Sequence, residues 1–286
     1  MKQKSSSKWQ GMLLLTLKYI VLIIGAILFL LPFLFMLSMS LTDSHELFQI
    51  PFRLIPRSLN WLNYKEAWTE NYPFNLFLKN TIFVTGIFIL GQVTVCSLVA
   101  YSFARLRWRG RNLLFTVLLS TLMLPAQVVI IPQFIYFSKL GWVNTYYPLL
   151  IPWIFGRGAF PIFLLRQFYM TIPLDLDEAA KIDGATYFQI YYKILLPLLK
   201  PALGVVAING FMFQWNNFFE PLIYINEKAK FTLALGLRMF QAGEFGTYWN
   251  FLMADSVLVA LPCFIIFFLF QKYLVQGTII GGGLKG

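Results

Sequence analysis

The sequence contains little charge. Only 12% of its 286 residues are Asp, Glu, Lys or Arg, whereas 58% are hydrophobic. Soluble globular domains carry about 25% charged residues, so this composition argues against a water-soluble fold. The mean hydropathy of +0.68 supports the same conclusion. The chain is therefore predicted to be a membrane protein.

The sequence also lacks the residues from which most catalytic and metal sites are built. It has one histidine, His45, and two cysteines, Cys96 and Cys263. A zinc site needs several converging ligands, and a nucleophilic side chain needs a base beside it. We therefore assign no catalytic residue and no metal ligand. His45 is expected to face solvent, and the cysteines are expected to be small buried residues.

No G-x-x-x-x-G-K-[ST] motif occurs, so the chain is not expected to hold ATP phosphates in a P-loop. The closing GTIIGGGLKG is rich in glycine but lacks that spacing, and it is predicted to be a flexible tail. No cofactor is therefore expected on this chain itself.

Long apolar runs are abundant. Three stretches are free of charge, and three more are interrupted by only one or two charged residues. A membrane-spanning helix needs roughly 20 apolar residues, so we predict six spans in an all-α membrane protein. The first run is too long for the core of a signal peptide and is expected to remain as a span. The six predicted spans cover residues 19–42, 80–104, 112–138, 146–168, 198–224 and 250–271.

The positive charge of the chain, +11, follows a pattern typical of membrane topology. RLRWRGR (residues 105–111) places four arginines in a short loop, and such loops lie on the cytoplasmic side. This orientation makes residues 1–18 and 272–286 cytoplasmic, so both termini lie inside, and residues 43–79 form an external loop. Because topology explains the excess charge, no nucleic-acid partner is expected.

Five charged residues interrupt the predicted spans, and three of them are candidates for ionisable residues deep in the membrane: Arg157, Glu220 and Asp255. Such residues mark ion pathways in some transporters. Here we expect them to pair with one another or with water near the surface. A transport protein without a clear ion relay needs another source of energy.

A polar segment, DEAAKIDGATYFQIYYKILLP (residues 177–197), lies between the fourth and fifth spans. Asp175 is expected to cap a helix over residues 175–182, with Glu178 at the capping-box offset. Gly184 follows the helix, where a left-handed residue favours glycine. Thr186 and Gln189 repeat the capping pattern and begin a second short helix.

Two further features of this segment bear on its role. Pro197 is expected to kink or break the chain where it re-enters the membrane. Connections between helices usually have about 2–8 residues, so a connection this long is more typical of a functional element than of an inert linker.

The segment also resembles the coupling-loop signature of binding-protein-dependent ABC importer permeases. That signature is Glu-Ala-Ala, three residues, Gly, nine residues, Ile, one residue and Leu-Pro. Flanking motifs, among them NYKEAW, AYSFARLRWRG, MLPAQVVIIP and FQWNNFFEPL, are similar to the second permease of maltose-type carbohydrate importers. The matching positions are Glu178, Ala179, Ala180, Gly184, Ile194, Leu196 and Pro197.

The resemblance implies the six-helix fold of type I ABC importer permeases, with a core over residues 80–271 and a coupling loop over residues 169–197. In that family the loop docks on a separate cytoplasmic ATPase. Glu178 would face a basic residue there, Ala179 and Ala180 would allow close approach, and Gly184 would form the bend. Asp183 is expected to belong to the same contact.

The resemblance also implies the partners. They are a sister permease forming a heterodimer, two ATPase subunits that bind ATP and Mg, and an extracytoplasmic sugar-binding protein. The expected location is the bacterial cytoplasmic membrane, crossed several times. The expected function is import of a carbohydrate, more narrowly an oligosaccharide. The alternatives are an ABC permease for a non-sugar solute and a stand-alone secondary transporter.

Two further sets of residues are candidates for contacts with cargo or binding protein. Asn209, Phe213, Asn216 and Glu220 recur on one face of a helix and could line a sugar path or join neighbouring helices. By resemblance, an outer loop is expected to contact the binding protein. Its residues are Gln241, Ala242, Gly243 and Glu244.

Overall fold

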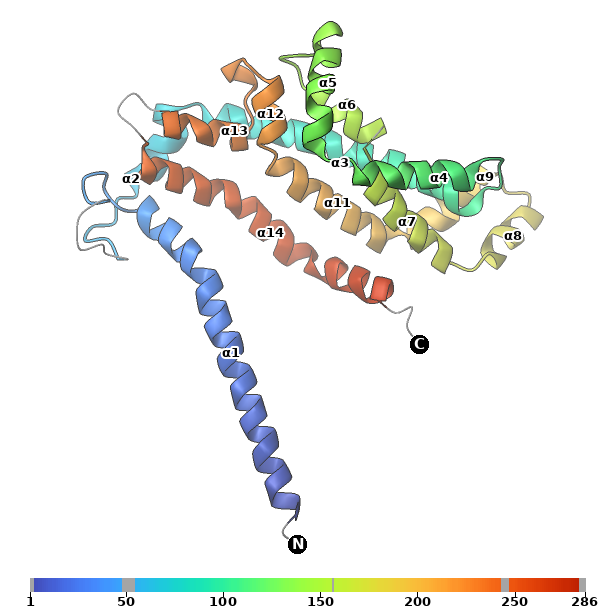
Figure 1. The fold of residues 1–286 in the computed structure, drawn as a ribbon, viewed down its shortest axis with the longest axis horizontal. Coiled ribbons are helices and arrows are strands. Elements are labelled where there is room, and N and C mark those ends of the chain that lie inside the picture. Colours follow the sequence, from blue (N-terminus) through green and yellow to red (C-terminus); the bar gives the residue numbers. More distant parts are fainter. Residues whose placement is uncertain (1–2, 48–54, 156, 243–246, 283–286) are drawn as a thin grey trace. The chain divides into compact units, whose positions relative to one another are not determined.

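The computed structural model describes residues 3–47, 55–155, 157–242 and 247–282. Every regular element in these ranges is helical, which confirms the all-α prediction (Figure 1). The elements are α1 (Gln3–Ser40), α2 (Leu62–Lys65), η1 (Glu66–Asn71), α3 (Phe74–Arg105), α4 (Arg111–Ser120), η2 (Thr121–Met123), α5 (Ala126–Lys139), α6 (Tyr147–Phe155), α7 (Ala159–Thr171), α8 (Asp175–Ile182), α9 (Tyr187–Gln189), η3 (Ile190–Leu195), α10 (Leu196–Leu198), α11 (Lys200–Trp215), α12 (Phe219–Tyr224), η4 (Lys228–Lys230), α13 (Leu233–Leu237), η5 (Arg238–Ala242) and α14 (Trp249–Gly282).

Within the described residues, 4 helices are long and apolar enough to cross a membrane, or up to 6 if each of two bent pairs is one span. The upper number equals the six spans expected from the sequence. The 4 helices are Met12–Ser40, Phe74–Arg105, Tyr147–Thr171 and Trp249–Gln271.

The third predicted span is not one straight helix. Its two halves, Arg111–Met123 and Gln127–Lys139, are bent by 103°. Leu124 between them is extended, with φ −81° and ψ 116°. A residue before proline is disfavoured in the helical region, so Pro125 accounts for the break.

The fifth predicted span is also interrupted, because α11 ends at Trp215 and α12 begins at Phe219. Asn217 lies in the gap. Its side-chain oxygen accepts from the backbone N–H of Glu220 at 3.3 Å, and its amide nitrogen donates to the Glu220 carboxylate at 3.0 Å. Asparagine competes with helical hydrogen bonds in this way, which explains why the helix does not continue.

The chain divides into two compact units. The first unit comprises Met1–Tyr72 and Leu237–Ala260. In it, the buried Asn63 amide donates to the carbonyls of Ser40 and Thr42 at 2.9 and 3.0 Å and accepts from Asn250 at 3.1 Å. These bonds fix the end of α1, whose exposed apolar surface is typical of a helix in contact with lipid or another chain. His45, in the same unit, is exposed as expected.

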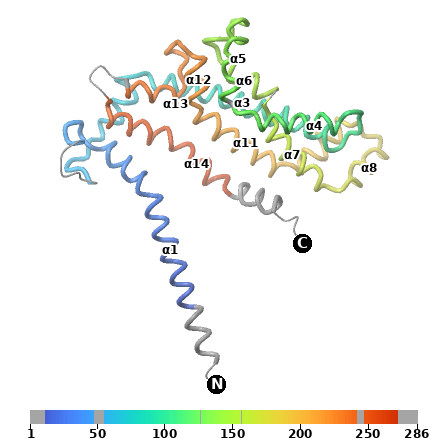
Figure 2. Tube along the Cα trace, in the orientation of Figure 1, coloured from blue at the N-terminus to red at the C-terminus, as the bar shows by residue number. Residues whose placement is uncertain are grey.

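The second unit comprises Pro73–Gly236 and Leu261–Gly286, and α3 is its central helix. The helices α6, α7 and α11 pack against α3 (Figure 2). Glycine allows one of these close approaches, since a Cβ on Gly158 would lie 2.5 Å from Cys96 Sγ. Cys96 is buried as expected, whereas Cys263 is only half-buried.

Candidate functional site

The polar segment between α7 and α11 forms a helix, a turn and a second helix. The first helix, α8, has the predicted bounds Asp175–Ile182. Gly184 follows with φ +80°, the left-handed conformation expected there. The capping box of the second helix is also confirmed. Thr186 Oγ1 accepts from the Gln189 backbone at 3.3 Å, and Gln189 Oε1 accepts from the Thr186 backbone at 2.8 Å.

The predicted cap at Asp175 is wrong. The N-cap is Leu174, which already has helical dihedral angles (φ −70°, ψ −23°), and no side chain caps this helix. A capping side chain requires a residue with extended backbone at the helix start, and Asp175 is instead the first helical residue. Its carboxylate, with those of Asp177 and Glu178, still lies in the first turn, where negative charge stabilises a helix N-terminus.

A buried ion pair attaches α8 to the end of α3. Arg105 Nε lies 3.5 Å from Asp177 Oδ2, and the two side chains are only 3% and 8% exposed. Arg105 also donates to the carbonyl of Ile172 at 2.7 Å. On the other side of the turn, the Tyr101 hydroxyl donates to the carbonyl of Tyr187 at 3.0 Å. The last turn of α3 therefore holds the segment on both sides of Gly184.

Burial and charge oppose each other at Asp177. Burial raises the pKa of the Asp177 carboxyl, while Arg105 and, more weakly, Lys181 act to lower this pKa. Asp177 Oδ1 has no hydrogen-bond partner within the described part of the chain. Asp177 therefore depends on the Arg105 charge, and removing either partner would leave the other buried and uncompensated.

Buried apolar and aromatic side chains pack the second half of the segment against α3. Ile190, Tyr191 and Leu195 are buried side chains of η3, a π-helix. The Tyr191 hydroxyl donates to Ser97 of α3 at 3.3 Å, and the rings of Tyr191 and Tyr101 lie 5.3 Å apart. The segment is therefore held on α3 both by side-chain packing and by hydrogen bonds.

The bend near Pro197 lies slightly later than the proline itself. Pro197 lies within α10, and the helices Tyr187–Leu198 and Lys200–Trp215 are bent by 77°. Leu199 is the residue between them. The missing N–H of Pro201, in the first turn of α11, prevents a regular helical bond across the break.

One face of the segment is open. Glu178, Ala179 and Asp183 are exposed, and Ile182 is 87% exposed. Ala180 is different: it is only 7% exposed and packs in a hydrophobic cluster of this chain that includes Tyr101 and Tyr191. The expectation that both alanines allow close approach of a partner is therefore wrong for Ala180. The 3.6-residue period explains this, since adjacent helical residues point about 100° apart.

The other signature residues occupy the far end of the segment. Ile194 and Leu196 are half-buried against the same hydrophobic cluster, and Pro197 is exposed. Beside α8 lies an open cavity of about 530 Å³, lined by Arg105–Trp108 side chains together with Leu174, Asp177, Glu178, Lys181 and Tyr187.

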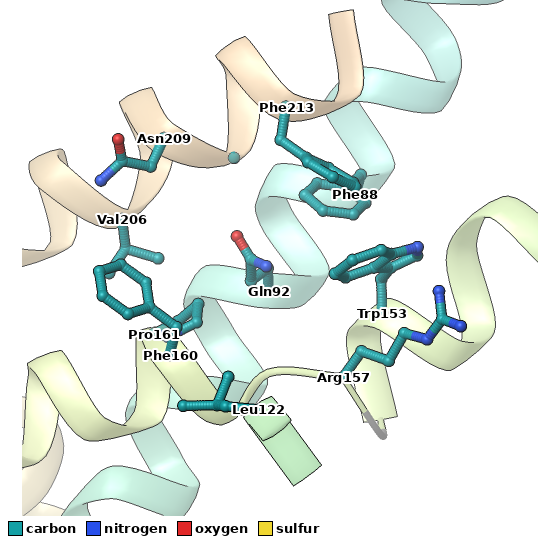
Figure 3. A pocket seen from close by; sticks show the side chains of 11 residues that line it. Phe88, Gln92, Leu122, Trp153, Arg157, Phe160, Pro161, Val206, Asn209 and Phe213 are labelled. Atoms are coloured by element: carbon teal, nitrogen blue, oxygen red, sulfur yellow. The ribbon is translucent and has the colours of Figure 1, made fainter. Parts of the chain in front are cut away.

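A second cavity lies among α3, α6, α7 and α11 (Figure 3). Its volume is about 220 Å³. Asn209 and Phe213, two members of the predicted stripe, line it. Its lining comprises Phe88, Gln92, Leu122, Trp153, Arg157, Phe160, Pro161, Val206, Asn209, Gly210 and Phe213.

Asn216 and Glu220 do not share this lining, so the stripe of four residues on one helical face is wrong. Asn216 ends α11 and donates to the carbonyl of Met212 at 2.8 Å. Glu220 belongs to α12, beyond the break at Asn217. The predicted periodicity assumed one continuous helix, which the Asn216–Asn217 pair interrupts.

The ionisable residues of the spans behave differently from one another. Arg157 and Glu220 form the expected pair at 2.9 Å, and Glu220 also accepts from Trp153 Nε1 at 3.0 Å. Arg157 further donates to Gln133 at 2.7 Å. Asp255 does not pair as expected: it is fully buried, and neither carboxylate oxygen has a hydrogen-bond partner among the described residues.

The outer loop is described only in part. Gln241 is exposed at the end of η5, and Ala242 is the last residue of that element. Gly243 and Glu244 lie outside the described residues.

Sequence reasoning missed the residues that support the two sites. Arg105 and Asp177 are 72 positions apart, and no local pattern indicates their pairing. Gln92 and Trp153 were also missed. Arg157, by contrast, could be recognised from the sequence, because a charged residue inside an apolar run requires a partner or a cavity nearby.

The candidate membrane spans and the exposed helical segment between two of them define an all-helical, multi-pass membrane protein. The family described as the inner membrane component of binding-protein-dependent transport systems matches residues 92–280. The chain belongs to this family of ABC importer permeases. It is therefore a multi-pass membrane component of an ABC importer and is not itself catalytic, because ATP binding in this family belongs to the partner ATPase.

Relatives match along most of the chain. The sn-glycerol-3-phosphate permease UgpE of Pectobacterium atrosepticum is 33% identical over 91% of this chain and 94% of its own length. The arabinooligosaccharide permease AraQ of Halalkalibacterium halodurans is 33% identical over 89% and 91%. The trehalose/maltose permease MalG of Thermococcus litoralis is 34% identical over 94% and 98%.

A solved structure agrees with these sequence matches. A chain of a bacterial ABC transporter involved in the import of the acidic polysaccharide alginate superposes with a TM-score of 0.82. It is 25% identical, and the match covers 94% of this chain and 97% of that one. This likeness confirms the permease fold.

The Arg105–Asp177 pair provides a direct test of how the segment is held. We expect Asp177→Asn to lower the free energy of unfolding in detergent micelles by about 3 kcal/mol, because it leaves Arg105 buried without a counter-charge. Asp175→Asn, on the same helix but exposed, should change it by less than about 0.5 kcal/mol. Equal effects of the two substitutions in a denaturant titration would show that the buried pair does not hold α8.

Proposed function

We propose that this chain is the permease subunit that passes a carbohydrate through the cytoplasmic membrane, driven by ATP that separate subunits hydrolyse. The sugar is delivered by an extracytoplasmic binding protein. A sister permease forms the other half of the membrane path, and two ATPase subunits bind from the cytoplasm. Gln241–Glu244 belong to the surface that meets the binding protein.

The observation that carries this proposal is the attachment of the polar segment. Glu178, Ala179 and Asp183 form an open face, while Asp177 and Ala180 of the same helix are buried against this chain. A helix held in this way transmits a displacement that a flexible loop would absorb. We assign the open face to the contact with the ATPase, with Gly184 as its bend and Ile194, Leu196 and Pro197 as its return to the membrane.

The orientation follows from the same segment and the arginine-rich loop. Arg105 and Arg107 of this loop line the cavity beside α8, and Arg109 and Arg111 follow them in the chain. Lysine and arginine concentrate in short cytoplasmic loops. The segment and both termini are therefore assigned to the cytoplasm.

The cargo class is supported by the relatives. Those named above include permeases for arabinooligosaccharides and for trehalose and maltose, and the alginate importer also carries a saccharide. An oligosaccharide is therefore the proposed cargo. The glycerol-3-phosphate relatives, at the same 33% identity, favour a phosphorylated polyol as the second candidate.

Gly184→Asp tests the coupling role. Aspartate adopts φ +80° only with strain, so we expect the bend to change and uptake to fall at least tenfold while the protein still reaches the membrane. Gly141→Asp is the matched control, since Gly141 also has positive φ (+69°) and open space around it. Uptake and co-purification with the ATPase are measured together. Undiminished uptake with normal ATPase association in Gly184→Asp would argue against the role.

Cysteine labelling tests the orientation. In a variant without Cys96 and Cys263, a cysteine replaces either Asp183 or Lys228, both of which are exposed. A membrane-impermeant maleimide should label Lys228→Cys in intact spheroplasts and Asp183→Cys only after permeabilisation. Labelling of Asp183→Cys from outside would overturn the proposed topology and the ATPase contact together.

Reconstituted transport tests the cargo. The importer is purified with its ATPase, sister permease and binding protein, placed in liposomes with internal ATP, and offered maltotriose, raffinose, an arabinooligosaccharide, glycerol 3-phosphate and methionine. We expect ATP-dependent uptake of at least one sugar and none of methionine. Uptake of only glycerol 3-phosphate would favour the second candidate, and uptake of methionine alone would contradict the carbohydrate assignment.

A further inference from the structure

The cavity among α3, α6, α7 and α11 has an aromatic wall. The rings of Trp153 and Phe213 lie 4.4 Å apart, and Phe88 stacks on Phe213 at 5.9 Å. Trp153 is held in place because its Nε1 donates to both oxygens of the Glu220 carboxylate, at 3.1 and 3.0 Å. Figure 3 shows these rings on one side of the cavity. The apolar faces of a sugar ring stack on such a wall.

Amide groups lie beside the aromatic wall. Gln92 is only 5% exposed, lines the cavity and makes no hydrogen bond with any described residue. Its amide points into the space among the other lining side chains (Figure 3). Buried amides normally have partners, so an unpaired one that faces a cavity indicates a polar ligand or water. Asn209, an exposed residue of the facing helix α11, adds a second amide to the lining.

The absence of a side chain at Gly210, opposite Gln92, leaves space for the Gln92 amide. A Cβ on Gly210 would lie 2.8 Å from Gln92 Oε1. Glycine at this position therefore lets the amide lie against α11 while still facing the cavity.

The charge in the cavity wall is compensated by an ion pair. Among the described residues that line it, Arg157 alone is charged, and Glu220 neutralises that charge at 2.9 Å. The second terminal nitrogen of the guanidinium, Nη2, donates to Gln133 Oε1 at 2.7 Å. An anionic cargo would require an uncompensated cation, which this set of lining residues does not offer. The balance therefore favours an uncharged ligand.

From these observations we infer that the cavity is a subsite for one ring of an uncharged saccharide, so that this chain touches its cargo directly. The inference rests on the proposed carbohydrate function. Aromatic faces with a few convergent polar groups are typical of small-molecule sites. The volume of about 220 Å³ is below the range of about 300–1,000 Å³ for drug-sized ligands, which suits a single ring of a longer chain.

Saturation-transfer NMR on the purified importer without its binding protein tests the subsite. The probes are maltotriose and raffinose, which are uncharged, and trigalacturonate, which is anionic. We expect at least one uncharged probe to bind and trigalacturonate not to compete with it. Phe213→Leu and Gln92→Leu should each weaken that binding about tenfold.

Two further variants make the result specific. Phe83→Leu, a matched change on α3 at a side chain that is 55% exposed and does not line the cavity, should leave binding unchanged. Phe213→Tyr keeps the aromatic face and should retain binding. Basal ATPase activity of each assembled importer shows that the variant has folded.

The outcomes separate the subsite from the proposed function. Sugar uptake by the unmodified importer, together with equal probe binding in Phe213→Leu, Gln92→Leu and Phe83→Leu, would overturn the subsite and leave carbohydrate import intact. Binding of trigalacturonate in place of both uncharged probes would overturn the uncharged class. If the proposed carbohydrate function itself is wrong, the unmodified importer would take up no sugar in the liposome assay.

Discussion

The salt bridge between Arg105 and Asp177 is the contact on which the functional geometry depends. Both side chains are nearly inaccessible, so each charge is stable only in the presence of the other. The pair joins the last residue of α3 to the first turn of α8. Any force applied to the open face of α8 is therefore delivered to the end of the longest helix in its unit.

The same helix forms a wall of the cavity. Gln92 and Phe88 lie on α3, 13 and 17 residues before Arg105, which corresponds to about 20 and about 26 Å along a helix. A continuous helix with no proline inside is stiff over this length. The segment proposed to meet the ATPase and the cavity proposed to meet the sugar are therefore joined by one rigid element, whose displacement would alter both together.

Local patterns predicted local structure well. The bounds of α8, the left-handed Gly184 and the Thr186–Gln189 box depend on neighbouring residues, and the sequence contains all of that information. The errors have two causes, local backbone geometry and tertiary packing. Asp175 failed as a cap because Leu174 already has helical angles, and Glu220 left the stripe because Asn217 bonds locally. The Arg105–Asp177 pair depends on tertiary packing, which no local pattern records.

The broken spans explain why such a chain would work as part of an assembly. Unpaired backbone groups are costly in lipid, so non-helical backbone is tolerated at membrane depth only where protein or water covers it. At Leu124 and Pro125 the chain is extended between helices bent by 103°, and both residues are exposed in the isolated chain. The exposed apolar surface of α1 likewise requires contact with lipid or with another chain. Cover for the break at Pro125 must come from a neighbouring chain or a hydrated path, and the sister permease proposed above would supply both.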